Sequence, residues 1–282
     1  LPIGMNVQGL SYYSPGFFND VMTASSNWIT YYDGSGWDTQ KRASLQLDSN
    51  GYPVEIPQTI DGQATRVRCM INNCYSGKYR ILWDGEGEVT FSSGGIQSVD
   101  GKRYITLNGQ CGHTWLQIVR STRGNHIRNI RILPEALADT YDPRRPEHLF
   151  DSLFLKGLRP FHALRFMDWP STNGSKQRRW NDRPKPTDFS QGIRGFCWEH
   201  ALTLANHLDA DPWICVPHAA DDGYILALAR LVKTTMKPGR KVYLEYSNEI
   251  WNWQFSQAQY VIKDGRLAED PGLNSPDSIY NA

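Results

Sequence analysis

The feature that most constrains the fold is a repeating order of helix and strand that begins after Pro134. Apolar residues at helical spacing over 146–158 precede an apolar run at 163–169, and the same order recurs over 201–218 and 225–249. Strands that follow one another through helices pair in parallel, because the helical crossover returns the chain to the same end of the sheet. The sequence therefore predicts an α/β fold with a parallel sheet.

The first 133 residues divide into two further segments. Residues 1–30 resemble one more β/α unit, a short strand followed by a helix that begins near Pro15. Residues 31–133 carry short β-rich runs separated by Gly, Asn and Asp at intervals of roughly 8–12 residues, which is typical of an antiparallel sandwich. We therefore expect three parts: a first β/α unit over 1–30, an inserted β-sandwich over 31–133, and β/α units two to four over 134–282.

This count limits the fold to four β/α units, whereas a closed eightfold barrel needs roughly 200 to 250 residues. Too few residues lie outside the 31–133 segment to form all eight units. We expect the natural chain to continue beyond Ala282; the alternatives are a second chain that completes the barrel, or an open sheet.

Charge and composition indicate which classes of binding partner the protein has. Lys and Arg total 30 against 29 Asp and Glu, a net charge of +1, so nothing predicts bulk attraction to nucleic acid or to an anionic membrane. No run of 18 apolar residues predicts a membrane span, and residues 1–25 lack a signal-peptide pattern, which indicates a soluble chain trimmed at its start. The 10 Trp and 14 Tyr residues suit stacking on sugar rings as well as core packing.

The five cysteines leave their pairing open. Cys69 and Cys74 are close enough in sequence for a turn to join them as a disulfide, with free thiols as the equal alternative. Cys197 and Cys215 lie in apolar stretches and are expected in the core. Cys111 is then the odd cysteine, with no assigned partner. No Cys or His pair repeats at zinc-ligand spacing, so no metal site is expected.

Polar residues gather where the expected parallel strands end, at Arg165, Asp168, Trp169, His218, Asp221, Asn248 and Glu249. The carboxyl ends of parallel strands lie at one edge of the sheet, and that edge carries the site in such folds. We therefore expect Arg165, His218 and Glu249 to converge on one cleft.

The run EYSNEIWN, with Asn248 directly before Glu249, resembles the acid/base motif of retaining TIM-barrel glycoside hydrolases, the clan of cellulases, mannanases and galactosidases. LRFMDW resembles the clan's second-strand segment, which supplies an Arg at Arg165, and PWICVPH resembles the third strand, whose terminal His matches His218. The resemblance covers residues 1–30 and 134–255. A closer likeness is to large secreted bacterial proteins with RFMDW and EYSNE blocks, which implies secretion.

That resemblance implies a retaining mechanism with Glu249 as the general acid/base and Asn248 hydrogen-bonded to a sugar hydroxyl. Arg165 would orient the nucleophile and keep it ionised. The clan's nucleophile is a second Glu after strand seven, and these 282 residues contain no such strand, so the chain alone is expected to be inactive. Ile250 follows Glu249 where cellulases often have Pro, which leaves the substrate class open.

Each of these residues also has a structural explanation. Arg165 could pair with Asp168 or Glu199 as a structural ion pair, and His218 could satisfy a backbone contact.

Asp221 could be a helix N-cap, and together with His218 and Glu249 it could bind a cation. Trp169 and Trp251 are expected to stack on sugar, whereas Trp213 is expected in the core.

The sequence therefore predicts a secreted hydrolase of a β-linked polysaccharide or oligosaccharide, without cofactor or metal. The assigned residues are Glu249 for catalysis and, for the substrate, Asn248, Arg165, His218, Asp168, Trp169 and Trp251. Two alternatives remain: a carbohydrate-binding protein without turnover, and a structural or adhesive surface protein that uses the sandwich for assembly.

Overall fold

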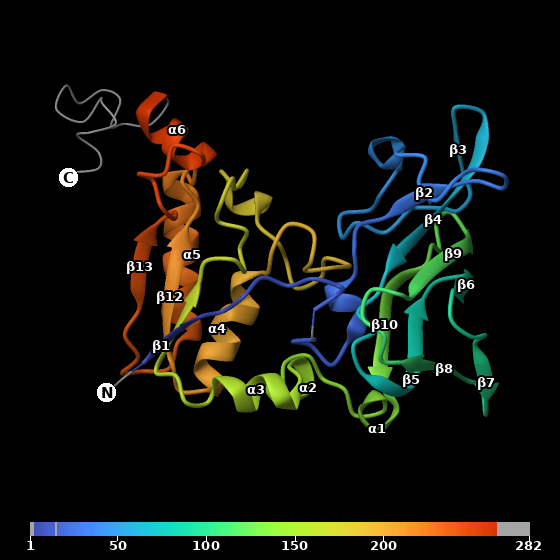
Figure 1. Ribbon diagram of the computed structural model, residues 1–282, viewed down its shortest axis with the longest axis horizontal. Coiled ribbons are helices and arrows are strands. Elements are labelled where there is room, and N and C mark those ends of the chain that lie inside the picture. Colours follow the sequence, from blue (N-terminus) through green and yellow to red (C-terminus); the bar gives the residue numbers. More distant parts are fainter. Residues whose placement is uncertain (1–2, 15, 264–282) are drawn as a thin grey trace. The chain divides into compact units, whose positions relative to one another are not determined.

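The computed structural model describes residues 3–14 and 16–263. These residues form two compact units (Figure 1). The first unit comprises residues 3–9, 156–186 and 194–263, and the second comprises residues 10–155 and 187–193.

The first unit is built on a four-stranded parallel sheet in the order β1-β11-β12-β13. Its strands are β1 (Gly4–Asn6), β11 (Ala163–Phe166), β12 (Asp211–Val216) and β13 (Tyr243–Tyr246). They come from the four segments that the sequence predicts as parallel strands. Their order across the sheet is the same as their order along the chain, with the strands of the other unit inserted between β1 and β11. Closure of such a sheet into a barrel stays a prediction.

Alternation along these strands gives the sheet two different faces. Leu164, Phe166 and Ile214 are fully buried on one face, where the strands contact helix α4 (Trp198–His207). The opposite face carries the larger polar side chains, because residues two apart point to the same side. Arg165 belongs to that second face.

Helices follow most of the expected positions. The structure contains α1 (Glu135–Ala138), α2 (Pro146–Leu149), α3 (Ser152–Leu158), α4, α5 (Asp222–Thr235) and α6 (Ser256–Lys263), with 3₁₀ turns η1 (Val21–Ala24), η2 (Arg42–Ser44) and η3 (Trp180–Asp182). The single helix expected over 146–158 is divided at Phe150, which takes an extended conformation. Phe150 instead forms an antiparallel bridge with Phe18 and packs against its ring, so a tertiary contact overrides the helical pattern.

The second unit contains two antiparallel sheets, in the orders β10-β5-β8-β7 and β2-β4-β9-β6, with β3 paired to β4. The strands are β2 (Ile29–Tyr31), β3 (Gln58–Ile60), β4 (Gln63–Met70), β5 (Ser76–Asp84), β6 (Gly87–Phe91), β7 (Gln97–Val99), β8 (Lys102–Asn108), β9 (Trp115–Ser121) and β10 (Arg128–Pro134).

One hydrophobic core joins both sheets. It includes Val67 and Ile118 from one sheet and Ile81, Ile105 and Ile132 from the other, all of them buried. Strand β4 shows why the sequence pattern found this unit, because its buried positions alternate with more exposed ones.

The structure divides the chain at different positions from those expected. Residues 10–30 belong to the antiparallel unit, as do residues 134–155 and 187–193. Pro15, near which a helix was expected to begin, lies outside the described residues, and the segment after it forms η1 instead. Met22 and Trp28 pack into the core of the second unit, and burying these apolar side chains explains where the segment belongs.

The disulfide differs from the pairing considered from sequence. Cys74 bonds to Cys111, whereas Cys69 is a free, buried thiol in β4, so the Cys69–Cys74 pairing is wrong. The side chain of Cys69 points into the core between the two sheets, where Cys74 does not lie. Cys197 and Cys215 are fully buried, as expected.

In the part of the chain that the structure describes, no helix combines the length and the apolar character needed to cross a membrane.

Candidate functional site

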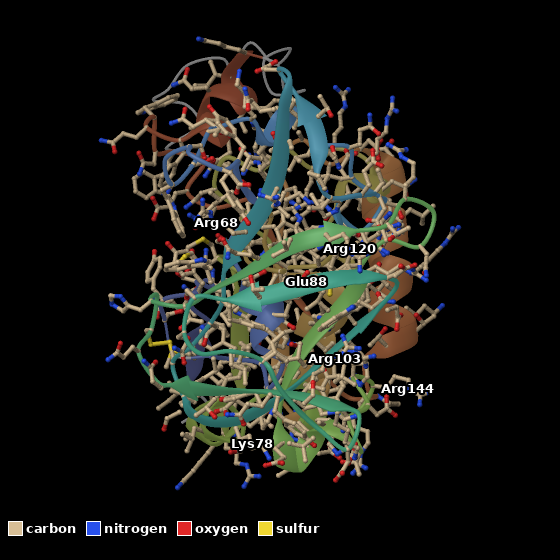
Figure 2. All side chains as sticks on the ribbon, turned by 90° about the vertical axis from the view of Figure 1, so that its right-hand side faces the viewer. Arg68, Lys78, Glu88, Arg103, Arg120 and Arg144 are labelled. Carbon is tan, nitrogen blue, oxygen red and sulfur yellow. A yellow bond between two sulfur atoms is a disulfide. The ribbon has the colours of Figure 1, made fainter. Side chains whose placement is uncertain are left out.

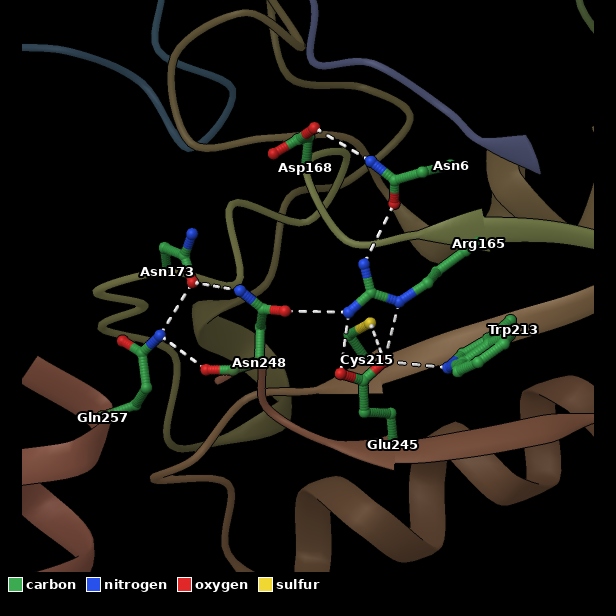
Figure 3. Close-up of polar contacts among 9 residues, drawn as sticks. All are labelled: Asn6, Arg165, Asp168, Asn173, Trp213, Cys215, Glu245, Asn248 and Gln257. Atoms are coloured by element: carbon green, nitrogen blue, oxygen red, sulfur yellow. Dashed lines mark hydrogen bonds and ion pairs between the residues drawn. The ribbon is translucent and has the colours of Figure 1, made fainter. Parts of the chain in front are cut away.

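A hydrogen-bonded network surrounds Arg165 on the polar face of the parallel sheet (Figure 3). The guanidinium binds Glu245 of β13 through two contacts, Nε to Oε2 at 2.8 Å and Nη2 to Oε1 at 2.7 Å. It also donates to Oδ1 of Asn248 at 2.8 Å and to Oδ1 of Asn6 at 3.2 Å. Because these partners come from β1, β13 and the segment after β13, one side chain ties together residues far apart in the sequence.

Glu245 is the acidic partner in this network. Its Oε2 atom also accepts hydrogen bonds from Nε1 of Trp213 at 2.8 Å and from Sγ of Cys215 at 3.2 Å. Burial raises the pKa of the Glu245 carboxyl, but the hydrogen bonds from Arg165, Cys215 and Trp213 outweigh it and the pKa lies below its ordinary value. The carboxylate therefore stays ionised and engaged at neutral pH.

Asn248 is buried and held on both sides. Its side chain accepts from Arg165 and donates to Oδ1 of Asn173 at 3.0 Å. Nε2 of Gln257 in α6 donates to Asn173 and also to the backbone carbonyl of Asn248 at 2.9 Å. The position of Asn248 is thus fixed by side chains from three separate segments.

Glu249 follows this anchored residue in an unusual backbone conformation. Its φ is +44°, and Ser247 on the other side of Asn248 has φ +55°. Non-glycine residues rarely adopt this left-handed region, and strained residues of this kind cluster at functional sites. The Glu249 side chain is exposed, with Oε2 accepting a hydrogen bond from Nδ2 of Asn252 at 3.0 Å.

His218 lies in a separate pocket of about 660 Å³. The pocket is lined by Arg178, His218, Ala219, Ala220, Asp221, Asp222, Gly223, Tyr246, Tyr260 and Val261. His218 is 8% exposed, and its Nδ1 atom is buried without a hydrogen-bond partner among the described residues. Burial lowers the pKa of His218, which favours the neutral ring. Its ring packs edge-on against Tyr260, at 5.1 Å between centroids.

The first turn of α5 borders the same pocket. The Asp221 side chain accepts a hydrogen bond from the backbone N–H of Tyr224 at 2.8 Å and caps the helix. The N-cap explanation is therefore confirmed.

The two predicted residues that follow β11, Asp168 and Trp169, have different roles. Asp168 accepts a long hydrogen bond of 3.5 Å from Asn6 and thus touches the network at its edge. Trp169 is only 1% exposed, packs against Phe166 and Phe196, and donates its indole N–H to the carbonyl of Gln8. Trp169 is therefore a core residue with no face for a sugar ring, contrary to expectation.

Two further tryptophans, Trp251 and Trp213, are both partly exposed to solvent. Trp251 is 47% exposed, as stacking on a ligand requires. Trp213, expected in the core, lies on the polar face of the sheet at 37% exposure, because alternation along β12 turns its neighbours Pro212 and Ile214 inward. A pocket of about 440 Å³ opens beside it, lined by Gly4, Met5, Asn6, Ala163, Arg165, Trp213 and Tyr243.

The ion-pair partners considered for Arg165 are also corrected. Glu199 pairs with Arg183 at 2.7 Å, and Arg165 pairs with Glu245. No group of three or more His, Cys, Asp or Glu residues over 3–14 and 16–263 is arranged to hold a metal ion.

The structure thus joins Arg165, Asn248 and, through Asn6, Asp168 in one network, and places His218 in a pocket of its own. Sequence reasoning missed Asn6, Asn173 and Gln257, which are ordinary amides with no motif. Sequence reasoning also missed Glu245. Residues two apart in a strand point to the same side, so alternation along the strand places Glu245 on the same face of the sheet as Tyr243.

No protein family, no curated protein and no solved structure matches the chain.

Proposed function

We propose that this protein acts on β-linked polysaccharides or oligosaccharides as a secreted glycoside hydrolase of the retaining type, with Glu249 as the proton donor. The observation that carries the proposal is the exposed, left-handed Glu249, which directly follows an Asn248 fixed by Arg165 and Gln257. General acid catalysis needs a carboxyl group held in a defined position, and the fixed neighbour Asn248 supports that role for Glu249.

The chemistry requires two carboxyl groups. A glycosidic oxygen leaves readily only when protonated, and a second carboxylate about 5–5.5 Å away attacks the anomeric carbon. Glu245 does not suit that second role, because Arg165, Trp213 and Cys215 occupy its oxygens. We assign no nucleophile among the described residues; a further segment or a second chain would supply it.

Substrate contacts are expected on both sides of the β13 end. The exposed indole of Trp251 offers a stacking surface two residues after Glu249. The pocket at His218 is lined by two tyrosines and by Arg178 and Asp222, side chains that can stack on or hydrogen-bond a sugar. The Cys74–Cys111 disulfide supports secretion, because such bonds persist in oxidising compartments.

A second candidate is glycan binding without turnover. The full engagement of Glu245 favours it, since the carboxylate of the Arg165 network is committed to structure. In that case the pocket and Trp251 would bind sugar while no bond breaks.

The test of the proposal is Glu249→Gln in the full chain, assayed with any segment or chain that completes the site. The amide keeps the shape but cannot donate a proton, so hydrolysis of unactivated glycosides is expected to fall by about 10²–10⁴, with nearly unchanged affinity. Activated aryl glycosides need little protonation, and azide should restore their turnover. The matched control is Glu147→Gln, which changes an exposed glutamate of the other unit.

Full activity of Glu249→Gln on natural glycans would refute the acid/base role. Glycan binding by the unmodified protein without release of reducing ends would favour the second candidate.

A further inference from the structure

The outward face of the β2-β4-β9-β6 sheet presents an ordered row of polar side chains. The strand registers pair Arg68 with Gln117 and Gln117 with Thr90, and the apolar Ile29 lies opposite Arg68 at the end of this polar row. Their strand neighbours Val67, Leu116 and Ile118 are fully buried, so alternation turns the row away from the core. Arg68 is labelled in Figure 2, which also shows this unit's other charged side chains.

Aromatic rings cluster around this row. The guanidinium carbon of Arg68 lies 3.9 Å from the ring centroid of Tyr31 and 4.4 Å from that of Trp37. Trp37 in turn contacts Trp115 edge-on, with 4.9 Å between centroids. The indole of Trp37 is 45% exposed, although burial of such a ring is worth a large hydrophobic free energy. Its neighbours hold it in place while much of its surface stays open.

Hydrogen-bonding groups accompany these rings. The side chain of Arg68 makes no hydrogen bond to the described residues, and its Nε is buried and unpaired. Gln117 donates only a long bond of 3.3 Å to Oγ1 of Thr90. A guanidinium, an amide and a hydroxyl therefore lie in line beside an exposed indole.

The charges of the face are balanced. Arg66 pairs with Asp33 at 2.7 Å. Burial lowers the pKa of Arg68, and the nearby acidic side chain of Asp38 opposes that shift. Arg120 lies 3.6 Å from Glu86 and opposite Glu88 in the register. A polyanion would gain little here, because each cation already has an acidic neighbour. The complementary ligand is uncharged.

We propose that this face binds a neutral glycan chain, with sugar rings stacked on Trp37 and their hydroxyls hydrogen-bonded by Arg68 and Gln117. The apolar C–H face of a pyranose suits an aromatic ring, and its equatorial hydroxyls suit planar amide and guanidinium groups. The choice of glycan rests in part on the proposed function, but the surface belongs to the other unit and needs no catalysis. It would hold the polymer while the site around Glu249 acts on it.

The experiment measures binding of the full chain to a soluble, uncharged β-glucan by affinity electrophoresis and by tryptophan fluorescence. Trp37→Ala and, separately, Gln117→Ala are expected to weaken binding by about tenfold, equivalent to about 1.4 kcal/mol. Tyr13→Ala, which removes an exposed ring of the same unit, is the matched control and should bind normally. Unchanged thermal unfolding of each variant shows that the fold is retained.

Three results would overturn the proposal: no binding of the glucan, normal binding by both variants, or binding confined to acidic polymers with steep loss in salt. The outcomes for the two sites are separable. Glu249→Gln should keep this binding, and Trp37→Ala should keep turnover of small aryl glycosides. Glucan binding by the unmodified protein without any hydrolysis would refute the proposed function and leave this surface standing.

Discussion

At the scale of single residues, burial determines which ionisable side chains cost free energy when they are charged. Asp20 caps η1 and is 6% exposed, with Oδ1 accepting from the backbone N–H of Ile132 at 2.9 Å and of Met22 at 3.0 Å. Burial raises the pKa of Asp20 to about 6 from 3.8, although these two backbone donors oppose the shift. Its ionised form is therefore disfavoured in the folded chain.

The sign of the resulting pH dependence follows from linkage. The pKa of Asp20 in the folded chain lies above its unfolded value, so the protonated carboxyl favours folding. This contribution to the free energy of unfolding is fully present below pH 3.8 and is lost as the pH rises through about 6. Asp20→Asn keeps an acceptor oxygen without the charge. We expect the variant to be more stable at pH 7.5 by up to about 3 kcal/mol, and to lack the decline between pH 4 and 7.

Urea unfolding at pH 4.5 and pH 7.5 checks this prediction. Asp61→Asn, which removes an exposed carboxylate paired with Lys41, is the control and should change stability little. An Asp20→Asn protein that is less stable at both pH values would contradict the burial argument.

At the scale of elements, both local sequence signals and tertiary contacts set where helices begin and end. The sequence pattern located α5, and Asp221 begins it by accepting the Tyr224 N–H. The helix at 146–158, by contrast, is divided where Phe150 turns to pair with Phe18. A cap is a local interaction that can be predicted from the sequence, whereas an isolated bridge to a distant segment cannot.

The capping role predicts a measurable loss. Asp221→Ala should lower the free energy of unfolding of the first unit by about 1 kcal/mol, because the Tyr224 N–H loses its acceptor. Asp221→Asn keeps an acceptor oxygen and should cost less. Hydrogen exchange of the first-turn amides of α5, measured with chemical unfolding, reports the effect; equal protection in both variants would contradict it.

At the scale of the whole molecule, the chain is organised as two compact units, and the Cys74–Cys111 disulfide lies in one of them. Cys74 and Cys111 are 37 residues apart and both belong to the second unit. Joining residues this far apart restricts the unfolded chain, which stabilises the folded unit by about 4 kcal/mol in the chain-entropy account.

We therefore expect the Cys74→Ser, Cys111→Ser protein to unfold more easily in the second unit alone. Hydrogen exchange with mass spectrometry should show faster exchange in β4, β8 and β9 and unchanged exchange in α4 and α5. Reduction of the unmodified protein should reproduce the effect. Equal destabilisation of both units would show that they do not unfold separately.

From the sequence we could predict the order of the four parallel strands, the antiparallel nature of the 31–133 segment and the location of Arg165 and Asn248 near strand ends. Each follows from periodicity or local turn chemistry, which depend on neighbours in the chain. Only the tertiary structure decided that Arg165 pairs with Glu245, that Cys74 bonds to Cys111 and that Trp169 is buried while Trp213 is not. These facts depend on strand register and on which distant segments share a core, because contacts between residues 37 to 80 positions apart leave no periodic trace in the sequence.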